Sequence, residues 1–170
     1  MGEIANILVM CTANRGRSPF TEYLLRKLID DREWGAGTRI RSAGLCCHEL
    51  GRGGMEADPK VVELGRKFGL DMSAHQATPM TRDMFEDCDL AIVMEQWQAD
   101  VLTQSLKPDP GKVVTLRQLG GADGDVTTPD ITNASPRGLD LFAAEARRCL
   151  EQGLNEGPLA DLIAPRPRAE

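Results

Sequence analysis

Apolar and polar positions alternate between two patterns along the chain. Four short segments have the apolar character of strands, at residues 4–11, 38–43, 89–94 and 112–116. Between them, apolar positions recur every three to four residues, as on one face of a helix. These helical segments lie at about 20–29, 58–68, 95–106 and 135–152. Strands that alternate with helices predict an α/β domain with a parallel sheet covered on both faces.

Local signals support the helix boundaries. Asp58 followed by Pro59 is a typical helix start, and the helix is expected to end before Gly69. Another helix is predicted to begin at Ser135-Pro136, and its expected buried face consists of Phe142, Ala146, Cys149 and Leu150. The 95–106 helix is expected to carry Trp97, Val101 and Leu102 on one side.

Two segments differ from this regular pattern. Residues 118–135 are rich in Gly and Asp and predict a long loop, of the kind that often carries function. Residues 164–170 have the composition of a disordered tail, so the predicted domain covers residues 1–163.

Composition narrows the function classes. A chain of 170 residues fits one domain, and its net charge of −6 argues against a nucleic-acid partner. We find neither an apolar run of membrane-spanning length nor a signal peptide, which predicts a cytoplasmic protein with no membrane partner. The five cysteines, at positions 11, 46, 47, 88 and 149, form no disulfide framework in a chain of this size.

The segment from Cys11 to Pro19 carries the strongest chemical signal. Cys11 closes the first predicted strand, a short loop follows, and Arg17 stands where the next helix begins. Ser18 is expected to cap that helix, with Pro19 in its first turn. In α/β proteins, ligands bind at the carboxyl ends of the strands, which is where Cys11 lies.

This layout suits a phosphate ester and a cysteine nucleophile. Backbone N–H groups of a loop that enters a helix bind an anion, and the helix dipole adds positive charge there. Arg17 can pair with two phosphate oxygens at once, and the same positive field favours the thiolate form of Cys11. We therefore predict covalent phosphoryl transfer to sulfur. The phosphate-binding loop would consist of Thr12, Ala13, Asn14, Arg15, Gly16, Arg17 and Ser18. The alternative for Cys11, an inert core cysteine, does not account for the surrounding loop.

With these residues in view, the chain resembles the low-molecular-weight protein tyrosine phosphatase family. The similarity covers nearly the whole chain and includes the Cys11–Pro19 loop and the segments 41–44, 69–75 and 89–94. It implies a single-domain, Rossmann-like fold with a four-stranded parallel sheet and helices on both faces. It further implies that Ser18 hydrogen bonds to Cys11, that Asn14 braces the loop, and that Ser42 and His75 orient Asn14.

The resemblance breaks at two positions of the site. Gly16 stands where the family usually carries a second cysteine, so Cys11 is expected to lack its usual disulfide partner. Thr128 stands where the family has the aspartate that protonates the leaving group, and a threonine cannot act as that acid. Asp130 or Asp125 could replace it, although either could equally be a loop-capping aspartate.

The expected walls of the pocket also differ from those of phosphotyrosine-specific members. His48 and the pair Asp130-Ile131 occupy positions where such members carry aromatic side chains. Trp34 and Trp97 are expected in the core, and Tyr23 in helix packing. A phosphotyrosine substrate is thus possible but not favoured by these walls.

The sequence predicts a cysteine-dependent phosphomonoesterase that acts on phosphotyrosine or a small phosphate ester. Cys11 would attack phosphorus, Arg17 would bind the phosphate, and Asp130 would handle the proton, with no cofactor and no metal. The partner would be a phosphorylated protein or a small phosphate ester.

Two alternatives stay open. One is a phosphate-binding or regulatory module that has lost turnover. The other is a thioredoxin-coupled arsenate reductase. Such an enzyme would need further cysteines beginning just after the predicted 89–94 strand, where this chain has Glu95, whereas Cys88 lies at the other end of that strand. The Cys46-Cys47-His48 segment lacks the spacing of a zinc site and reads as a loop.

Overall fold

The sheet is parallel, as its alternation with helices predicts. The computed structural model describes residues 4–34, 37–128 and 130–165. Four strands lie in the order β2-β1-β3-β4. They are β1 (Ala5–Cys11), β2 (Thr38–Gly44), β3 (Leu90–Val93) and β4 (Val113–Thr115). The expected strand segments, the fold class and the four-stranded parallel arrangement are thus confirmed.

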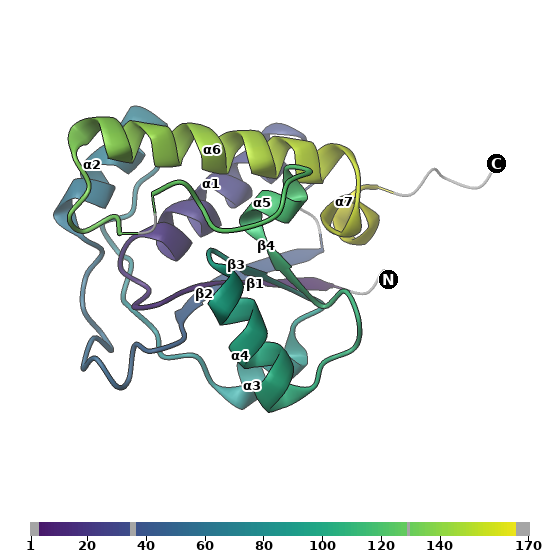
Figure 1. Ribbon diagram of the computed structural model, residues 1–170. Helices are drawn as coiled ribbons and strands as arrows, with labels where there is room; N and C mark the ends of the chain where they lie inside the picture. The colour runs from purple at the N-terminus through teal and green to yellow at the C-terminus, as the bar shows by residue number, and fades with distance from the viewer. Residues whose placement is uncertain (1–3, 35–36, 129, 166–170) are drawn as a thin grey trace.

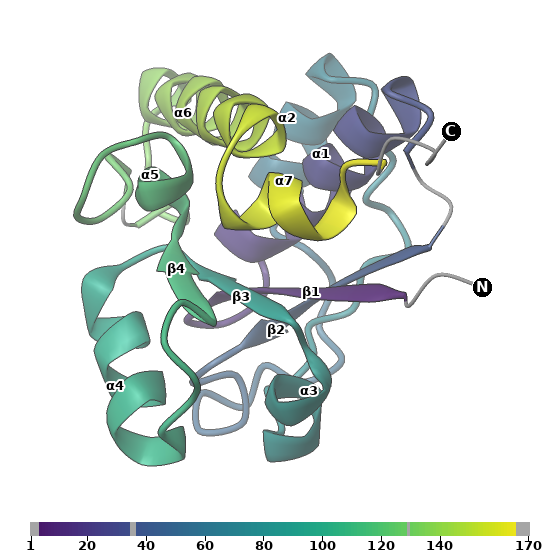
Figure 2. The ribbon, with the colours of Figure 1, turned by 90° about the vertical axis from the view of Figure 1, so that its right-hand side faces the viewer.

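Helices cover the sheet on both sides, as Figures 1 and 2 show. One side is covered by α1 (Arg17–Asp31), α2 (Pro59–Lys67), α5 (Leu116–Leu119), α6 (Pro136–Asn155) and α7 (Pro158–Ile163). The other side is covered by α3 (Arg82–Asp87) and α4 (Gln96–Leu106). In Figure 2 the two layers lie above and below the edge of the sheet.

The apolar run of β1 is continuous because each face of the strand packs into a different core. Ile7 and Val9 belong to the larger core, which also contains Phe20 of α1 and Phe142 of α6. Leu8 and Met10 point the other way, into a smaller core on the α3 and α4 side. A strand buried on both faces loses the alternation of polar and apolar residues that marks a half-exposed strand.

The register of the sheet sets the position of the site. Cys11 is paired with Gly44 at the carboxyl end of β2, and Val9 with Ser42. On the other side of β1, Met10 is paired with Val93 of β3. The segments that follow β1, β2 and β3 therefore leave the sheet side by side, and Cys11 lies between the other two.

Several local expectations were wrong. The buried face of α4 consists of Gln98, Ala99 and Leu102, whereas Trp97 and Val101 are exposed. Apolar spacing alone grouped Trp97 and Val101 with Leu102, but only a narrow face of α4 packs against the sheet. The short helices α3, α5 and α7 were not predicted, because so few residues show no helical period.

Helix starts were predicted with mixed success. The Asp58 side chain accepts a hydrogen bond from the Lys60 N–H and caps α2, as expected. Ser18, in contrast, is not a helix cap: α1 begins at Arg17 and its capping position is Gly16. The Ser18 hydroxyl instead contacts side chains of the preceding loop, namely those of Cys11 and Asn14.

The expected tail lies only partly within the described residues: residues 166–170 fall outside them. Within the described part of the chain, we find no helix that is long and apolar enough to cross a membrane.

Candidate active site

The loop that leaves β1 carries the cysteine at its base. Cys11 is buried, and its Sγ lies 3.0 Å from Ser18 Oγ, at hydrogen-bond distance. Asn14, in the middle of the loop, has a positive φ of 57°, which lets the chain turn back toward α1. A non-glycine residue in this region is held there by its surroundings.

Those surroundings are a set of hydrogen bonds that fix Asn14. Its Nδ2 donates to Ser18 Oγ and to Ser42 Oγ, both at 2.9 Å. Its Oδ1 accepts from the Thr78 N–H at 2.8 Å, and its backbone carbonyl lies 2.8 Å from His75 Nε2. The structure thus brings together the four residues that the resemblance grouped around the loop, and adds Thr78, which no sequence signal marked.

The hydrogen-bond chain continues into α1. The Ser42 hydroxyl donates to Glu22 Oε2 at 2.8 Å, and Glu22 is also paired with Arg26 at 2.9 Å. Burial raises the pKa of the Glu22 carboxyl, while the nearby Arg26 charge and the Ser42 hydrogen bond act in the opposite direction. The rings of Tyr23 and His75 pack in a T-shaped arrangement, in agreement with the packing role expected for Tyr23.

The raised pKa of Glu22 has a consequence for stability. A carboxyl that holds its proton more tightly in the folded state contributes most to stability below its unfolded pKa of 4.5, and this contribution is lost as pH rises through the folded pKa. We expect the free energy of unfolding of the wild type, relative to Glu22→Gln, to fall as pH rises from 4 to 7.

Denaturant unfolding at several pH values measures this difference, since the other titrating groups are common to both proteins. Glu63→Gln, which changes an exposed carboxylate paired with Arg66, serves as the control. The expected direction would be wrong if the free energy of unfolding of the wild type, relative to that of Glu22→Gln, rose toward neutral pH.

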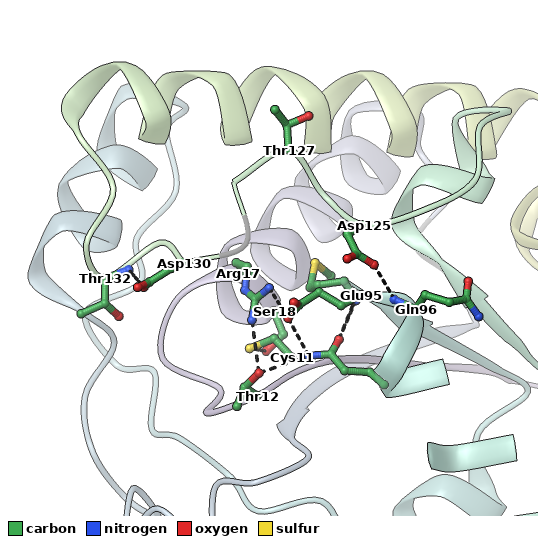
Figure 3. A network of polar contacts seen from close by, with 12 residues as sticks. Cys11, Thr12, Arg17, Ser18, Glu95, Gln96, Asp125, Thr127, Asp130 and Thr132 are labelled. Carbon is green, nitrogen blue, oxygen red and sulfur yellow. Dashed lines mark hydrogen bonds and ion pairs between the residues drawn. The ribbon is translucent and has the colours of Figure 1, made fainter. Parts of the chain in front are cut away.

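Arg17 lines the same cavity as the cysteine and is paired with Glu95, the residue that precedes α4. Its Nη1 is 2.7 Å from Glu95 Oε2, and its Nη2 donates to Thr12 Oγ1 at 3.3 Å (Figure 3). Gln98 Nε2 lies 3.3 Å from the same Thr12 oxygen. A buried guanidinium with a carboxylate partner is fixed in direction, and its remaining donors stay free for an anion.

These residues open into a cavity of about 500 Å³. It is lined by Cys11, Thr12, Ala13, Arg15, Gly16, Arg17, Leu50, Arg52, Glu95, Trp97, Asp130, Ile131 and Thr132.

Two expectations about the walls were wrong. His48 is not among the described residues that line the cavity; Leu50 and Arg52 of the same loop are. Trp97, expected in the core, lines the cavity and is 39% exposed. Trp34 packs against the main core, as expected.

The carboxylates of the 118–135 loop take different places, as Figure 3 shows. Asp130 lines the cavity, where it accepts hydrogen bonds from the Thr132 N–H at 3.1 Å and from Asn133 Nδ2 at 2.7 Å. The Asn133 hydrogen bonds hold the pKa of Asp130 below its ordinary value, with Thr132 adding to the effect.

Asp125 and Thr128 are engaged elsewhere. Asp125 accepts a hydrogen bond from the Gln96 N–H at 2.7 Å, which gives a partner to a free N–H group at the N-terminus of α4. Asp125 is not among the residues that line the cavity. The Thr128 hydroxyl donates to the Gly138 carbonyl.

The loop packs directly onto the phosphate-binding loop. A Cβ placed on Gly16 would fall well inside contact distance of Ile131 Cγ2, and Ile131 itself is buried. Lys60 Nζ donates to the Thr132 carbonyl at 3.0 Å and ties the same segment to α2. Glycine at position 16 therefore lets this segment approach the cavity.

Some site residues were missed in the sequence. Glu95 and Gln98 follow directly after β3, the neighbour of β1, so strand order would have pointed to them. Leu50 and Arg52 follow β2 in the same way, but a loop without periodic pattern does not reveal which of its side chains turn inward.

Fold and site together define the chain as a cysteine-dependent phosphatase of the α/β type. The sequence profile described as "Low molecular weight phosphotyrosine protein phosphatase" matches residues 6–156. The chain belongs to this family, and the resemblance found in its sequence is confirmed.

Relatives and solved structures agree with this membership. The chain is 30% identical to "Probable low molecular weight protein-tyrosine-phosphatase EpsP" of Ralstonia nicotianae, over 98% of each chain. It is 31% identical to "Protein-arginine-phosphatase" of Bacillus subtilis, over 73% of this chain and 79% of that relative. A crystal structure of a YwlE mutant from Bacillus subtilis is 28% identical, covering 87% of this chain and 95% of its own, with a TM-score of 0.74. The phosphatase from T. tengcongensis shares the fold, with a TM-score of 0.78 at 22% identity, covering 89% of this chain and 98% of its own.

Proposed function

We propose that the protein hydrolyses phosphate monoesters through a phosphocysteine at Cys11, with a phosphorylated protein or a small phosphate ester as substrate. The main observation behind this proposal is that Cys11 Sγ lies at hydrogen-bond distance from Ser18 Oγ. Cys11 and Arg17 also line the same cavity. A hydroxyl that donates to sulfur stabilises the thiolate, the attacking form. Relatives named as tyrosine and arginine phosphatases support a phosphoprotein substrate.

In the first step, the Cys11 thiolate attacks phosphorus in line, so that an S–P bond forms while the bond to the leaving oxygen breaks. The loop N–H groups of residues 12–18 and the Arg17 guanidinium bind the three phosphate oxygens as charge develops on them. Glu95 orients Arg17 toward this position through their 2.7 Å ion pair.

In the second step, water attacks phosphorus, so that an O–P bond forms while the S–P bond breaks and Cys11 leaves as a thiolate. The attacking water must give up a proton in this step. Asp130 lines the cavity, and because its pKa lies below the ordinary value it is deprotonated at neutral pH, so it can accept a proton from water but has none to donate to the leaving group. We therefore assign Asp130 to activation of water. The departing oxygen then receives no proton from an acidic side chain in the first step, so aryl esters, which leave as phenolates, are favoured over alkyl esters.

The experiment combines a series of aryl phosphates with trapping of the phosphoenzyme. We expect rates that fall steeply as the leaving phenol becomes less acidic. Asp130→Asn should slow dephosphorylation by about 10²-fold and let phosphocysteine accumulate, as seen by rapid quench and mass spectrometry. Asp125→Asn is the matched control, because Asp125 caps α4 outside the cavity lining.

Two outcomes would contradict the assignment. Equal dephosphorylation rates in Asp130→Asn and Asp125→Asn would remove Asp130 from the mechanism. Failure to release phosphate in a Cys11-dependent manner, even from the most acidic phenol, would leave a phosphate-binding module instead of an enzyme.

A further inference from the structure

Two apolar side chains stand exposed at the cavity that holds Cys11. Trp97 is 39% exposed and Leu50 is 50% exposed, and both line the cavity. Leu50 belongs to the segment after β2, and Trp97 is the second residue of α4, which follows β3. Because β1 lies between β2 and β3, the two side chains come from segments that follow the two strands flanking the strand of Cys11.

Packing within α4 does not explain the position of Trp97. The helix buries Gln98, Ala99 and Leu102, and Trp97 is not part of that face. Val101, one turn further along, is 44% exposed as well, but it does not line the cavity. An indole left in solvent at the mouth of a polar site is placed to contact what enters the site.

Charge at the same mouth adds a second feature. Arg15 and Arg52 line the cavity, and in the described part of the chain neither forms an ion pair with a carboxylate. Arg15 Nε donates to the Glu56 carbonyl at 2.8 Å, which fixes its side chain at the rim. Arg17, in contrast, is already neutralised by Glu95. Asp130 and Glu95 also line the cavity, and Arg15 and Arg52 are the lining arginines whose charge is not paired with a carboxylate in the described residues.

We propose that Trp97 is a specificity residue that stacks on the ring of an aromatic phosphate ester of the phosphotyrosine type, with Leu50 on the opposite side and with Arg15 and Arg52 binding acidic residues beside it. The proposal rests on the proposed function and assigns the residue that would contact the ring of its substrate. An indole with few rotatable bonds loses little entropy on binding a flat ring. The aromatic wall thus comes from α4 instead of from the positions of His48 and Asp130.

Binding of two non-hydrolysed probes tests the role of Trp97 without relying on turnover. Calorimetry measures the dissociation constants of benzylphosphonate, which carries a ring, and of inorganic phosphate, which does not. In Trp97→Ala we expect benzylphosphonate to bind about two- to tenfold more weakly, with phosphate unchanged. Trp97→Phe should recover part of the loss, and Val101→Ala should bind both probes like the wild type.

Equal affinities of Trp97→Ala and wild type for benzylphosphonate would overturn the proposal, and so would equal weakening of both probes. Failure of the proposed function would look different. The protein would then show no Cys11-dependent turnover of 4-nitrophenyl phosphate, while Trp97→Ala would still bind benzylphosphonate more weakly than the wild type does.

The charged rim is tested with paired phosphotyrosine peptides that differ only in acidic or neutral flanking residues. We expect the wild type to favour the acidic peptide several-fold in kcat/KM at low salt, and Arg52→Gln and added salt each to reduce that preference. The neutral peptide is the control within each protein. Equal kcat/KM for the two peptides in the wild type would overturn the assignment of Arg15 and Arg52.

Discussion

Cys11→Ser is expected to lower kcat for aryl phosphates by about 10⁴-fold or more, to the level of the buffer blank. A serine hydroxyl is not ionised at neutral pH, and it attacks phosphorus only when an adjacent base removes its proton. The side-chain partner of Cys11 is the Ser18 hydroxyl, which cannot act as that base. Oxygen replaces sulfur with little change in volume, so the loop and Arg17 keep their geometry.

Phosphate release and phosphate binding are measured on the same preparation. Cys11→Ser should still bind inorganic phosphate, which separates loss of the nucleophile from loss of the site. Cys46→Ser, a half-buried thiol in the loop after β2, is the matched control and should retain its activity. A Cys11→Ser protein with more than a tenth of wild-type turnover would rule out the phosphocysteine.

Arg17→Lys is expected to lower kcat/KM by about 10²- to 10³-fold, the range found when one donor to developing charge is lost. Lysine keeps the positive charge but not the planar fork that binds two phosphate oxygens. The loss should therefore exceed any change in phosphate affinity, because the donors matter most when charge builds up in the transition state.

The comparison uses steady-state kinetics with one good aryl phosphate and the dissociation constant of inorganic phosphate. Arg39→Lys, an exposed position near the amino end of β2, controls for the substitution itself. Kinetics of Arg17→Lys that match those of Arg39→Lys would show that Arg17 does not contact the reacting phosphate.

The phosphate-binding loop could be predicted from the sequence because its surroundings are local. The apolar run of β1, the Cys11–Arg17 spacing and the helix that follows are continuous in the chain, so each part constrains the next. The pairing of Asn14 with Ser42 depends on strand register and was reached only through the resemblance. His75 was likewise given by its motif and not by any property of a lone histidine.

The walls of the cavity could not be predicted in the same way. Apolar spacing placed Trp97 with Leu102, but spacing does not tell which apolar residues of a helix face the core and which face a site. The sequence could not tell which of the two loop aspartates, Asp125 or Asp130, lies at the cavity. The structure decides it, because Asp125 accepts a hydrogen bond at the N-terminus of α4 instead. That choice depends on tertiary contacts between segments far apart in the sequence.

The contact between Gly16 and Ile131 bears on how this enzyme tolerates oxidants. Position 16, next to Arg17, is where related phosphatases usually keep a thiol that can form a disulfide with an oxidised nucleophile. Here, a side chain at that position would collide with Ile131, in the segment that also brings Asp130 to the cavity. A thiol side chain beside Arg17 and the side chain of Ile131 would require the same small volume, and in this chain Ile131 fills it.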